Sequence, residues 1–188
     1  MAKVVKTLRY VRHSLKDGAN NAIGPKGIAL TKEKAVFAPY TDIFYGIYRT
    51  CQTALAYICH IGCAPGTRVH TPITEIGTDE LFAEMVNAEF KAAVKSGKTN
   101  IQAIYEAGHP EKQLVAWSED AALGVRKMLD LIPVGGFGLA LGHDPIIPLA
   151  AKAYGYSIPS LKEMEYLDFE LHDDGSIRAE VVITDPRQ

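Results

Sequence analysis

The chain has 188 residues, 47% hydrophobic and 22% charged, a composition typical of one soluble globular domain with a full core. The formal net charge of -2 gives no basic surplus, which argues against a nucleic-acid backbone or an anionic membrane as a partner. No apolar run can span a bilayer, lysines interrupt the first residues before a signal sequence can form, and three clustered cysteines do not suit a disulfide framework. We therefore expect a single cytoplasmic domain over residues 1–188.

Strand and helix signals alternate along most of the chain. Short runs rich in β-branched and aromatic residues predict strands, and apolar residues at helical spacing, ended by glycine or proline, predict helices. The expected strands are residues 7–12, 42–45, 68–73 and 137–141. The expected helices are residues 25–37, 48–61, 78–96, 101–107, a helix that begins at Pro110 or Ser118 and ends before Pro133, and residues 145–154. In the helix 48–61, the apolar positions expected to face the core are Leu55, Ile58 and Cys59.

The last part of the chain has a different pattern. Residues 164–171 and 177–183 predict two strands, and the intervening Asp173-Asp174-Gly175 is a hairpin signal. The alternation elsewhere favours a mostly parallel sheet with helices on both faces. We therefore expect an α/β fold, a three-layer α/β/α sandwich with a mostly parallel central sheet and a C-terminal antiparallel hairpin.

Polar residues follow the predicted strands at the points where they end. Arg12 and His13 close the first strand, Arg49 lies just past the second, Glu75 past the third and His143 past the fourth. Open α/β sheets bind their ligands at the carboxyl ends of the strands, so these five residues are expected to meet around one site.

The residue types at this site favour phosphoryl transfer. Arginines and histidines supply donors for a phosphoryl group, and Arg49 also lies at a helix start, where free backbone N–H groups attract anions. A neutral His13 can attack phosphorus in line while His143 donates to a phosphoryl oxygen. Because Arg12 and Arg49 can supply the positive charge that magnesium supplies in other phosphoryl-transfer enzymes, the chemistry requires no metal or other cofactor.

Transfer from an alcohol oxygen also needs a proton donor, and later a base that activates water. Glu75 is the nearest candidate for both roles, and Asp79 and Glu80 are alternatives. The nearby Cys59, His60 and Cys63 suggest a zinc site, but cysteines at this spacing in an apolar helix more often pack into a core, so we expect no metal there.

Five segments resemble the motifs of one superfamily, in that superfamily's own order. Residues 11–14, Val-Arg-His-Ser, resemble the Arg-His-Gly signature of the histidine phosphatases, and residues 23–27 resemble their Leu-Thr-x-x-Gly helix entry. Residues 47–54, Ile-Tyr-Arg-Thr-Cys-Gln-Thr-Ala, are similar to the Leu-x-Arg-Thr-x-Gln-Thr-Ala motif, the most specific match. Residues 141–145, Leu-Gly-His-Asp-Pro, resemble the Gly-His-x-Pro motif, and residues 73–77 resemble the segment with the acid/base carboxylate.

This resemblance implies a phosphohistidine intermediate at His13, phosphate binding by Arg12, Arg49 and His143, and no metal. The closing hairpin and the modest length are most similar to the small phosphohistidine phosphatase branch. The resemblance also suggests a small helical cap inserted over the site by residues 76–118.

The expected function is metal-independent hydrolysis of a phosphomonoester or phosphoramidate through phospho-His13, with a phosphorylated small molecule or a phosphoprotein as substrate. The closest alternative is a phosphoglycerate mutase-like phosphomutase, which returns the phosphoryl group to a second substrate oxygen. A catalytically silent phosphate-binding module is a further alternative, because the loop after His13 is irregular and Ser14 replaces the glycine of the family motif.

Overall fold

The computed structural model describes residues 2–19, 22–46, 48–70, 84–158 and 160–182. Among these residues, six strands form one sheet in the order β3-β2-β4-β1-β5-β6. The strands are β1 (Val4–Arg12), β2 (Asp42–Tyr45), β3 (Arg68–Val69), β4 (Phe137–Gly142), β5 (Tyr166–His172) and β6 (Ile177–Val182). The first four run parallel to one another, and β5 and β6 form the antiparallel hairpin beside β1, as the sequence predicted.

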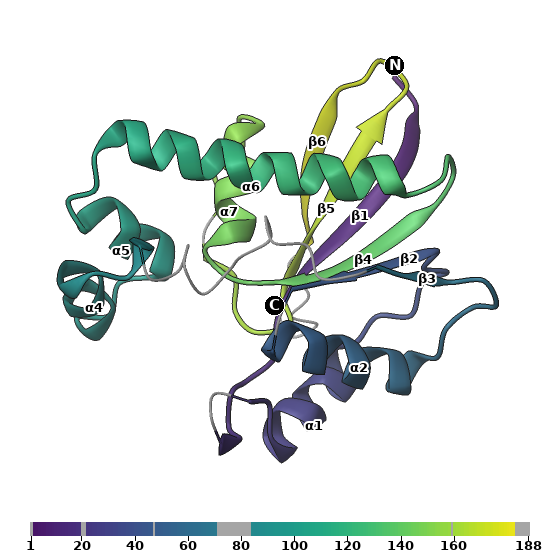
Figure 1. The fold of residues 1–188 in the computed structure, drawn as a ribbon, viewed down its shortest axis with the longest axis horizontal. Coiled ribbons are helices and arrows are strands. Elements are labelled where there is room, and N and C mark those ends of the chain that lie inside the picture. Colours follow the sequence, from purple (N-terminus) through teal and green to yellow (C-terminus); the bar gives the residue numbers. More distant parts are fainter. Residues whose placement is uncertain (1, 20–21, 47, 71–83, 159, 183–188) are drawn as a thin grey trace.

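Helices cover both faces of this sheet. The helices of the described residues are α1 (Pro25–Lys34), α2 (Arg49–Ile61), α4 (Ala88–Lys95), α5 (Asn100–Glu106), α6 (Glu111–Leu131) and α7 (Ile146–Ala153). Figure 1 shows α1 and α2 on one side of the sheet, α6 and α7 on the other, and α4 and α5 beyond one end of α6. The three-layer α/β/α prediction is therefore confirmed.

Alternation along the strands produces the two cores. Successive side chains of a strand point to opposite faces. In β1, Leu8 and Tyr10 are buried in the core that includes Val125 of α6, whereas Val11 is buried in the core that includes Tyr57 of α2. A strand covered on both faces therefore has a nearly continuous run of buried residues.

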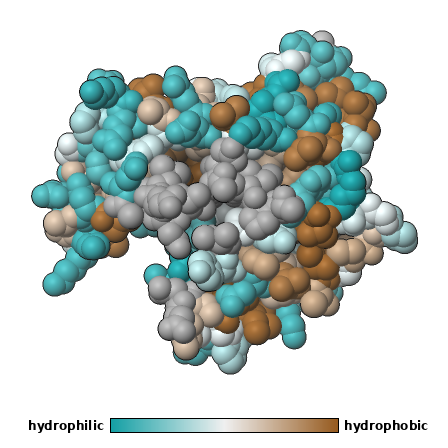
Figure 2. Space-filling model, in the orientation of Figure 1, coloured by the Kyte–Doolittle hydropathy of each residue, from teal (hydrophilic) through white to brown (hydrophobic). Residues whose placement is uncertain are grey.

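The buried face of α2 differs from the prediction. Leu55 is 58% exposed and Cys59 is exposed, so these two residues do not face the core. The buried side chains of α2 are Thr50, Thr53, Ala54 and Tyr57. Tyr57 explains part of the difference, since its ring fills the core and its hydroxyl accepts a hydrogen bond from Val36 N (2.8 Å). On the face seen in Figure 2, hydrophobic side chains accordingly gather over α2 and the neighbouring part of the sheet.

The single helix predicted over residues 78–96 is wrong in its described part. The backbone leaves the helical conformation at residues 86–87, and a new helix, α4, begins at Ala88. Asn87 causes the break, because its side chain accepts a hydrogen bond from Phe90 N (2.8 Å) as an N-cap. Residues 78–83 lie outside the described residues.

Other helix ends differ by a few residues from the predicted ones. The helix α6 begins at Glu111, so the alternative start at Ser118 is wrong, and the Ser118 hydroxyl donates to Leu114 O (2.9 Å) inside the helix. The helix predicted to end near residue 37 ends at Lys34, because Ala35 adopts an extended conformation. Residues 71–73 of the predicted third strand lie outside the described residues. In the described part of the chain, no helix combines the length and the hydropathy needed to cross a bilayer.

Candidate functional site

A cavity of about 270 Å³ lies at the carboxyl ends of the parallel strands. The residues that line it include Arg12, His13, Arg49 and His143, which come from three segments far apart in the sequence. The sheet brings them together, because β4 lies between β1 and β2 and Arg12 is in register with Gly142. The predicted acid/base residue Glu75 and its alternatives Asp79 and Glu80 lie outside the described residues.

The orientation of the His13 ring follows from a backbone contact. His13 Nδ1 lies 2.7 Å from Ser14 O, and the main-chain His13 N donates to Gly142 O (2.9 Å). A carbonyl oxygen only accepts, so Nδ1 carries the hydrogen and Nε2 of the neutral ring keeps its lone pair. Gly142 also has to be glycine, because a Cβ there would lie 2.2 Å from the Tyr10 ring.

Both imidazoles are held neutral. Burial of His13, together with the charges of Arg49 and Arg12, lowers its pKa from 6.5 to about 4, although the bond to Ser14 opposes this shift. Burial also lowers the pKa of His143 well below its usual range, and the neighbouring His13 and both arginines add to this effect. At neutral pH the cavity is therefore lined by two uncharged imidazoles and two positively charged guanidinium groups.

The loop after His13 is fixed by buried hydrogen bonds. Ser14, which replaces the expected glycine, is fully buried. Its backbone N donates to Thr53 Oγ1 of α2 (3.1 Å) and its hydroxyl donates to Gly27 O of α1 (2.7 Å). Serine at this position therefore adds a hydrogen bond between the loop and α1 that glycine could not make.

Asp17 anchors the next part of this loop to the start of α1. Its carboxylate accepts hydrogen bonds from the backbone N of Gly24 (2.7 Å), Lys26 (2.8 Å) and Gly27 (3.0 Å). These donors are among those that a helix start leaves without partners. The chain crosses itself closely here, because a Cβ on Gly27 would lie 2.3 Å from Leu15 O.

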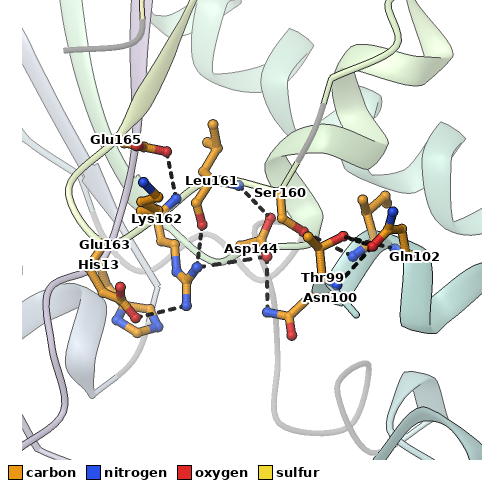
Figure 3. Close-up of polar contacts among 12 residues, drawn as sticks. His13, Thr99, Asn100, Gln102, Asp144, Ser160, Leu161, Lys162, Glu163 and Glu165 are labelled. Atoms are coloured by element: carbon orange, nitrogen blue, oxygen red, sulfur yellow. Dashed lines mark hydrogen bonds and ion pairs between the residues drawn. The ribbon is translucent and has the colours of Figure 1, made fainter. Parts of the chain in front are cut away.

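Arg12 is held by the loop that precedes β5. Its guanidinium donates to Leu161 O and to Glu163 Oε1 (3.0 Å), and it lies 3.9 Å from Asp144 Oδ2. The backbone of Arg12 also pairs with residues 164–165 at the start of the hairpin. Figure 3 shows Glu163 beside His13, so an acidic side chain faces this basic site.

Asp144 connects the site to α5. Its Oδ1 accepts from Leu161 N (3.1 Å) and its Oδ2 accepts from Asn100 Nδ2 (2.9 Å), so it lies between α5 and the loop before β5 (Figure 3). Burial raises the pKa of Asp144, and the charge of Arg12 and the hydrogen bonds oppose that shift. Because its oxygens accept from both Asn100 of α5 and Leu161 N, the Asp144 carboxylate holds α5 and the loop before β5 together.

Arg49 is the first residue of α2, where the backbone N–H groups and the helix dipole favour an anion. The preceding residue, Tyr48, has φ of 50°, in the left-handed region, and its side chain is 74% exposed. Such a conformation costs a non-glycine residue about 1–3 kcal/mol and is found mainly at functional sites. Here it turns the chain from β2 into α2 directly before Arg49.

Several lining residues were missed by the sequence analysis. The polar ones are Lys16, Asn100, Asp144 and Glu163, and the apolar ones are Met85, Val86, Phe90 and Ile104. Lys16 and Asp144 lie close in sequence to His13 and His143, a signal that could have identified them. Glu163 has no such signal, because its position depends on how the hairpin pairs with β1.

The described residues provide no metal centre. Cys59 and Cys63 are both exposed, so the expectation that they pack into the core is wrong. Within the described ranges, no group of three or more His, Cys, Asp or Glu side chains is placed to hold a metal ion.

No protein-family model matches this chain, and no curated protein matches its sequence. Solved structures match it over nearly its whole length. The phosphoglycerate mutase of Bacillus anthracis has a TM-score of 0.66 and 15% identity, covering 96% of this chain and 93% of the mutase. The phosphoserine phosphatase of Entamoeba histolytica, in complex with 3-phosphoglyceric acid, has a TM-score of 0.62 and 15% identity, with 96% and 98% coverage. A mycobacterial glucosyl-3-phosphoglycerate phosphatase has a TM-score of 0.61 and 14% identity, with 94% and 97% coverage. The chain therefore has the fold of the phosphoglycerate mutase-like histidine phosphatases.

Proposed function

We propose that this protein is a metal-independent phosphatase that hydrolyses a phosphomonoester or phosphoramidate through a phosphohistidine on His13. The observation that carries the proposal is the meeting of two arginines and two neutral histidines around one cavity. The bond from Nδ1 to Ser14 O adds to it, because it leaves the Nε2 lone pair for attack. The names of the structural neighbours, which include phosphatases, agree with this proposal.

In the first step, His13 Nε2 attacks phosphorus and forms an N–P bond while the P–O bond to the alcohol breaks. Arg12, Arg49 and His143 donate to the phosphoryl oxygens, where negative charge is held during the transfer. The departing oxygen takes a proton from a carboxylic acid and leaves as the alcohol.

In the second step, water attacks the phosphohistidine. A carboxylate takes one proton from this water as the new P–O bond forms, and the N–P bond breaks to give inorganic phosphate and neutral His13. The enzyme returns to its starting state without a change in oxidation state or the need for a further reactant.

Glu75 is our proposed acid and base. Among the described residues, the carboxylates that line the cavity are Asp144 and Glu163. Both are engaged, Asp144 by Asn100 and Leu161 N and Glu163 by Arg12, which argues against either as the main proton carrier. Loss of the acid should slow release of a poor leaving group far more than release of p-nitrophenol, which needs little protonation.

We further propose that residues 76–118 form a cap over the site, within one domain that covers residues 1–188. In the described part of that segment, α4 and α5 lie beyond the end of α6 (Figure 1). The lining of the cavity includes Phe90 of α4, Ile104 of α5, and Met85 and Val86, which precede α4. Membership of the small phosphohistidine phosphatase branch, a cytoplasmic location and a phosphorylated small molecule or phosphoprotein as substrate stay predictions.

A phosphomutase is the second candidate, because a phosphoglycerate mutase is among the structural neighbours. One experiment separates the two. Purified protein is given p-nitrophenyl phosphate in EDTA and, separately, 3-phosphoglycerate, with His13→Ala as the control. Phosphate release in EDTA that His13→Ala abolishes supports the phosphatase, and isomerisation of phosphoglycerate without phosphate release supports the mutase. Stabilisation by vanadate without either reaction would indicate a silent phosphate-binding module and overturn the proposal.

A further inference from the structure

The cavity has two chemically different sides. The basic side consists of Arg12, His13, Arg49 and His143, which lie at the ends of β1 and β4 and at the start of α2. The apolar side comes from a separate part of the chain and consists of Met85, Val86, Phe90 and Ile104. Of these, Val86 is half-buried and Phe90 is 9% exposed, so both present surface to the cavity, whereas Met85 and Ile104 are fully buried in the core that Val86 packs against.

The charges around the cavity do not suit a second anionic group on the substrate. The arginines and His143 are needed for the phosphoryl group itself. Of the other lining residues that the structure describes, Lys16 is a cation, whereas Asp144 and Glu163 are acidic. A carboxylate or second phosphate would therefore lose its hydration beside two negative charges and gain one exposed cation in return.

The volume of the cavity also limits the substrate. At about 270 Å³ it lies just below the range of roughly 300–1,000 Å³ that holds a drug-sized ligand. One phosphoryl group takes part of that space, which leaves room for a single ring or a short alkyl group. An apolar leaving group binds favourably to an apolar wall, because the transfer of that group from water to the surface of Phe90 lowers the free energy.

We propose that the site selects monophosphates of compact apolar alcohols, aromatic ones above all, over those that carry a second anionic or polar group. This inference rests on the proposed function and specifies its substrate class. In this account the arginines and histidines carry out the reaction, and the accessible surface of Val86 and Phe90 on the apolar side provides the selectivity.

The test compares substrates whose leaving alcohols have similar acidity. Benzyl phosphate, glycerol 1-phosphate and 3-phosphoglycerate are assayed for kcat/KM with the full chain. We expect benzyl phosphate to exceed each of the others by about tenfold or more, the size of effect that a small apolar group produces in an apolar pocket. Equal values, or a preference for 3-phosphoglycerate, would overturn the inference while leaving the phosphatase intact.

Variants locate the source of the preference. Phe90→Ala and Phe90→Leu remove apolar surface from the cavity. The matched control is Phe37→Ala, which removes an exposed phenylalanine outside the cavity. We expect Phe90→Ala to reduce the benzyl to glycerol ratio of kcat/KM by about fivefold, Phe90→Leu to reduce it less, and Phe37→Ala to leave it unchanged. This ratio does not depend on how much of the variant is folded, so a loss of stability cannot imitate the result. A ratio that stays the same in Phe90→Ala would contradict the inference.

A binding assay separates failure of this inference from failure of the proposed function. Benzylphosphonate and 3-phosphonopropionate, which cannot be hydrolysed, are compared by calorimetry. If no ester is turned over but benzylphosphonate binds about tenfold more tightly, the reaction fails and the selectivity stands. If 3-phosphonopropionate binds as tightly, the selectivity fails whatever the enzyme does.

Discussion

The imidazole rings of His13 and His143 meet edge to face, with their centroids 4.8 Å apart. Two protonated rings at that distance would repel each other. Burial lowers the pKa of both, and the two arginines add to the effect, so the neutral pair is the stable one. A neutral nucleophile beside a neutral donor is the combination that an attack on phosphorus requires.

The lowered pKa of His13 links stability to pH. Between about pH 4 and 6.5 the unfolded chain binds a proton that the folded ring excludes, so the free energy of unfolding decreases as the pH falls through that window. When the pH is lowered from 7 to 4.5, we expect the free energy of unfolding to fall by about 2 kcal/mol less in His13→Asn than in the wild type. Urea unfolding at both pH values, without phosphate, measures the difference. Phe37→Ala, which removes an exposed side chain that does not titrate, is the control and should keep the wild-type dependence. Parallel curves for His13→Asn and the wild type would refute the assignment of a lowered pKa.

Arg49 should contribute to anion binding through both its charge and the geometry of its guanidinium. Arg49→Lys keeps the charge but loses the planar pair of donors, so we expect vanadate to bind about tenfold more weakly, and more weakly still in Arg49→Ala. Calorimetry gives the dissociation constants. Arg126→Ala is the control, because Arg126 pairs with Asp130 on the exposed side of α6 (3.1 Å). If Arg49→Ala binds vanadate like the wild type, Arg49 has no role in the site.

Glu163 places a negative charge against Arg12 at a distance of 3.0 Å. An incoming phosphate must compete with it, so we expect Glu163→Gln to bind inhibitory phosphate about two- to fivefold more tightly. The inhibition constant of phosphate in the p-nitrophenyl phosphate assay provides the measurement. Glu165→Gln is a matched control, since Glu165 accepts from Lys162 N and does not line the cavity. Weaker phosphate inhibition in Glu163→Gln would mean that Glu163 supports binding by positioning Arg12.

The buried bond from Ser14 N to Thr53 Oγ1 should matter for both stability and turnover. Thr53→Val leaves a buried donor without its partner next to the nucleophile, at a cost of about 1–3 kcal/mol, and we expect kcat to fall as well. Thr31→Val removes another buried hydroxyl, which donates to Gly27 O inside α1 (2.9 Å), and serves as the control. Thr31→Val should lower the free energy of unfolding with little effect on kcat. If Thr53→Val lowers the free energy of unfolding but leaves kcat unchanged, the Thr53 bond acts on stability alone and the prediction is wrong.

The sequence predicted the sheet and the meeting of the four basic residues, because both follow from local patterns. The strand over residues 42–45 has the predicted bounds, and the residues that follow β1, β2 and β4 come together because parallel strands end at one edge. The motifs that contain these residues are short segments at or directly after the ends of those strands. Their position in space can therefore be predicted without the conformations of the longer loops.

Other features depended on tertiary contacts. Thr50 and Thr53 are buried on α2 while Leu55 is exposed, and the buried face of α2 contacts the loop after His13 as well as the core, because Thr53 Oγ1 accepts a hydrogen bond from Ser14 N. Glu163 reaches Arg12 only because β5 pairs antiparallel with β1 in a particular register. Hydrophobic periodicity contains no information on either contact.

The central claim is that the phosphoryl group passes through His13. The most direct measurement is mass spectrometry of the protein after a rapid alkaline quench during turnover of p-nitrophenyl phosphate, since phosphohistidine survives base and is lost in acid. We predict a phosphoryl group on the peptide that contains His13, formed within one turnover, released on further incubation, and absent in His13→Asn. Turnover by the wild type with no phosphoryl group on that peptide would contradict the account. Turnover by His13→Asn at the wild-type rate would also contradict it.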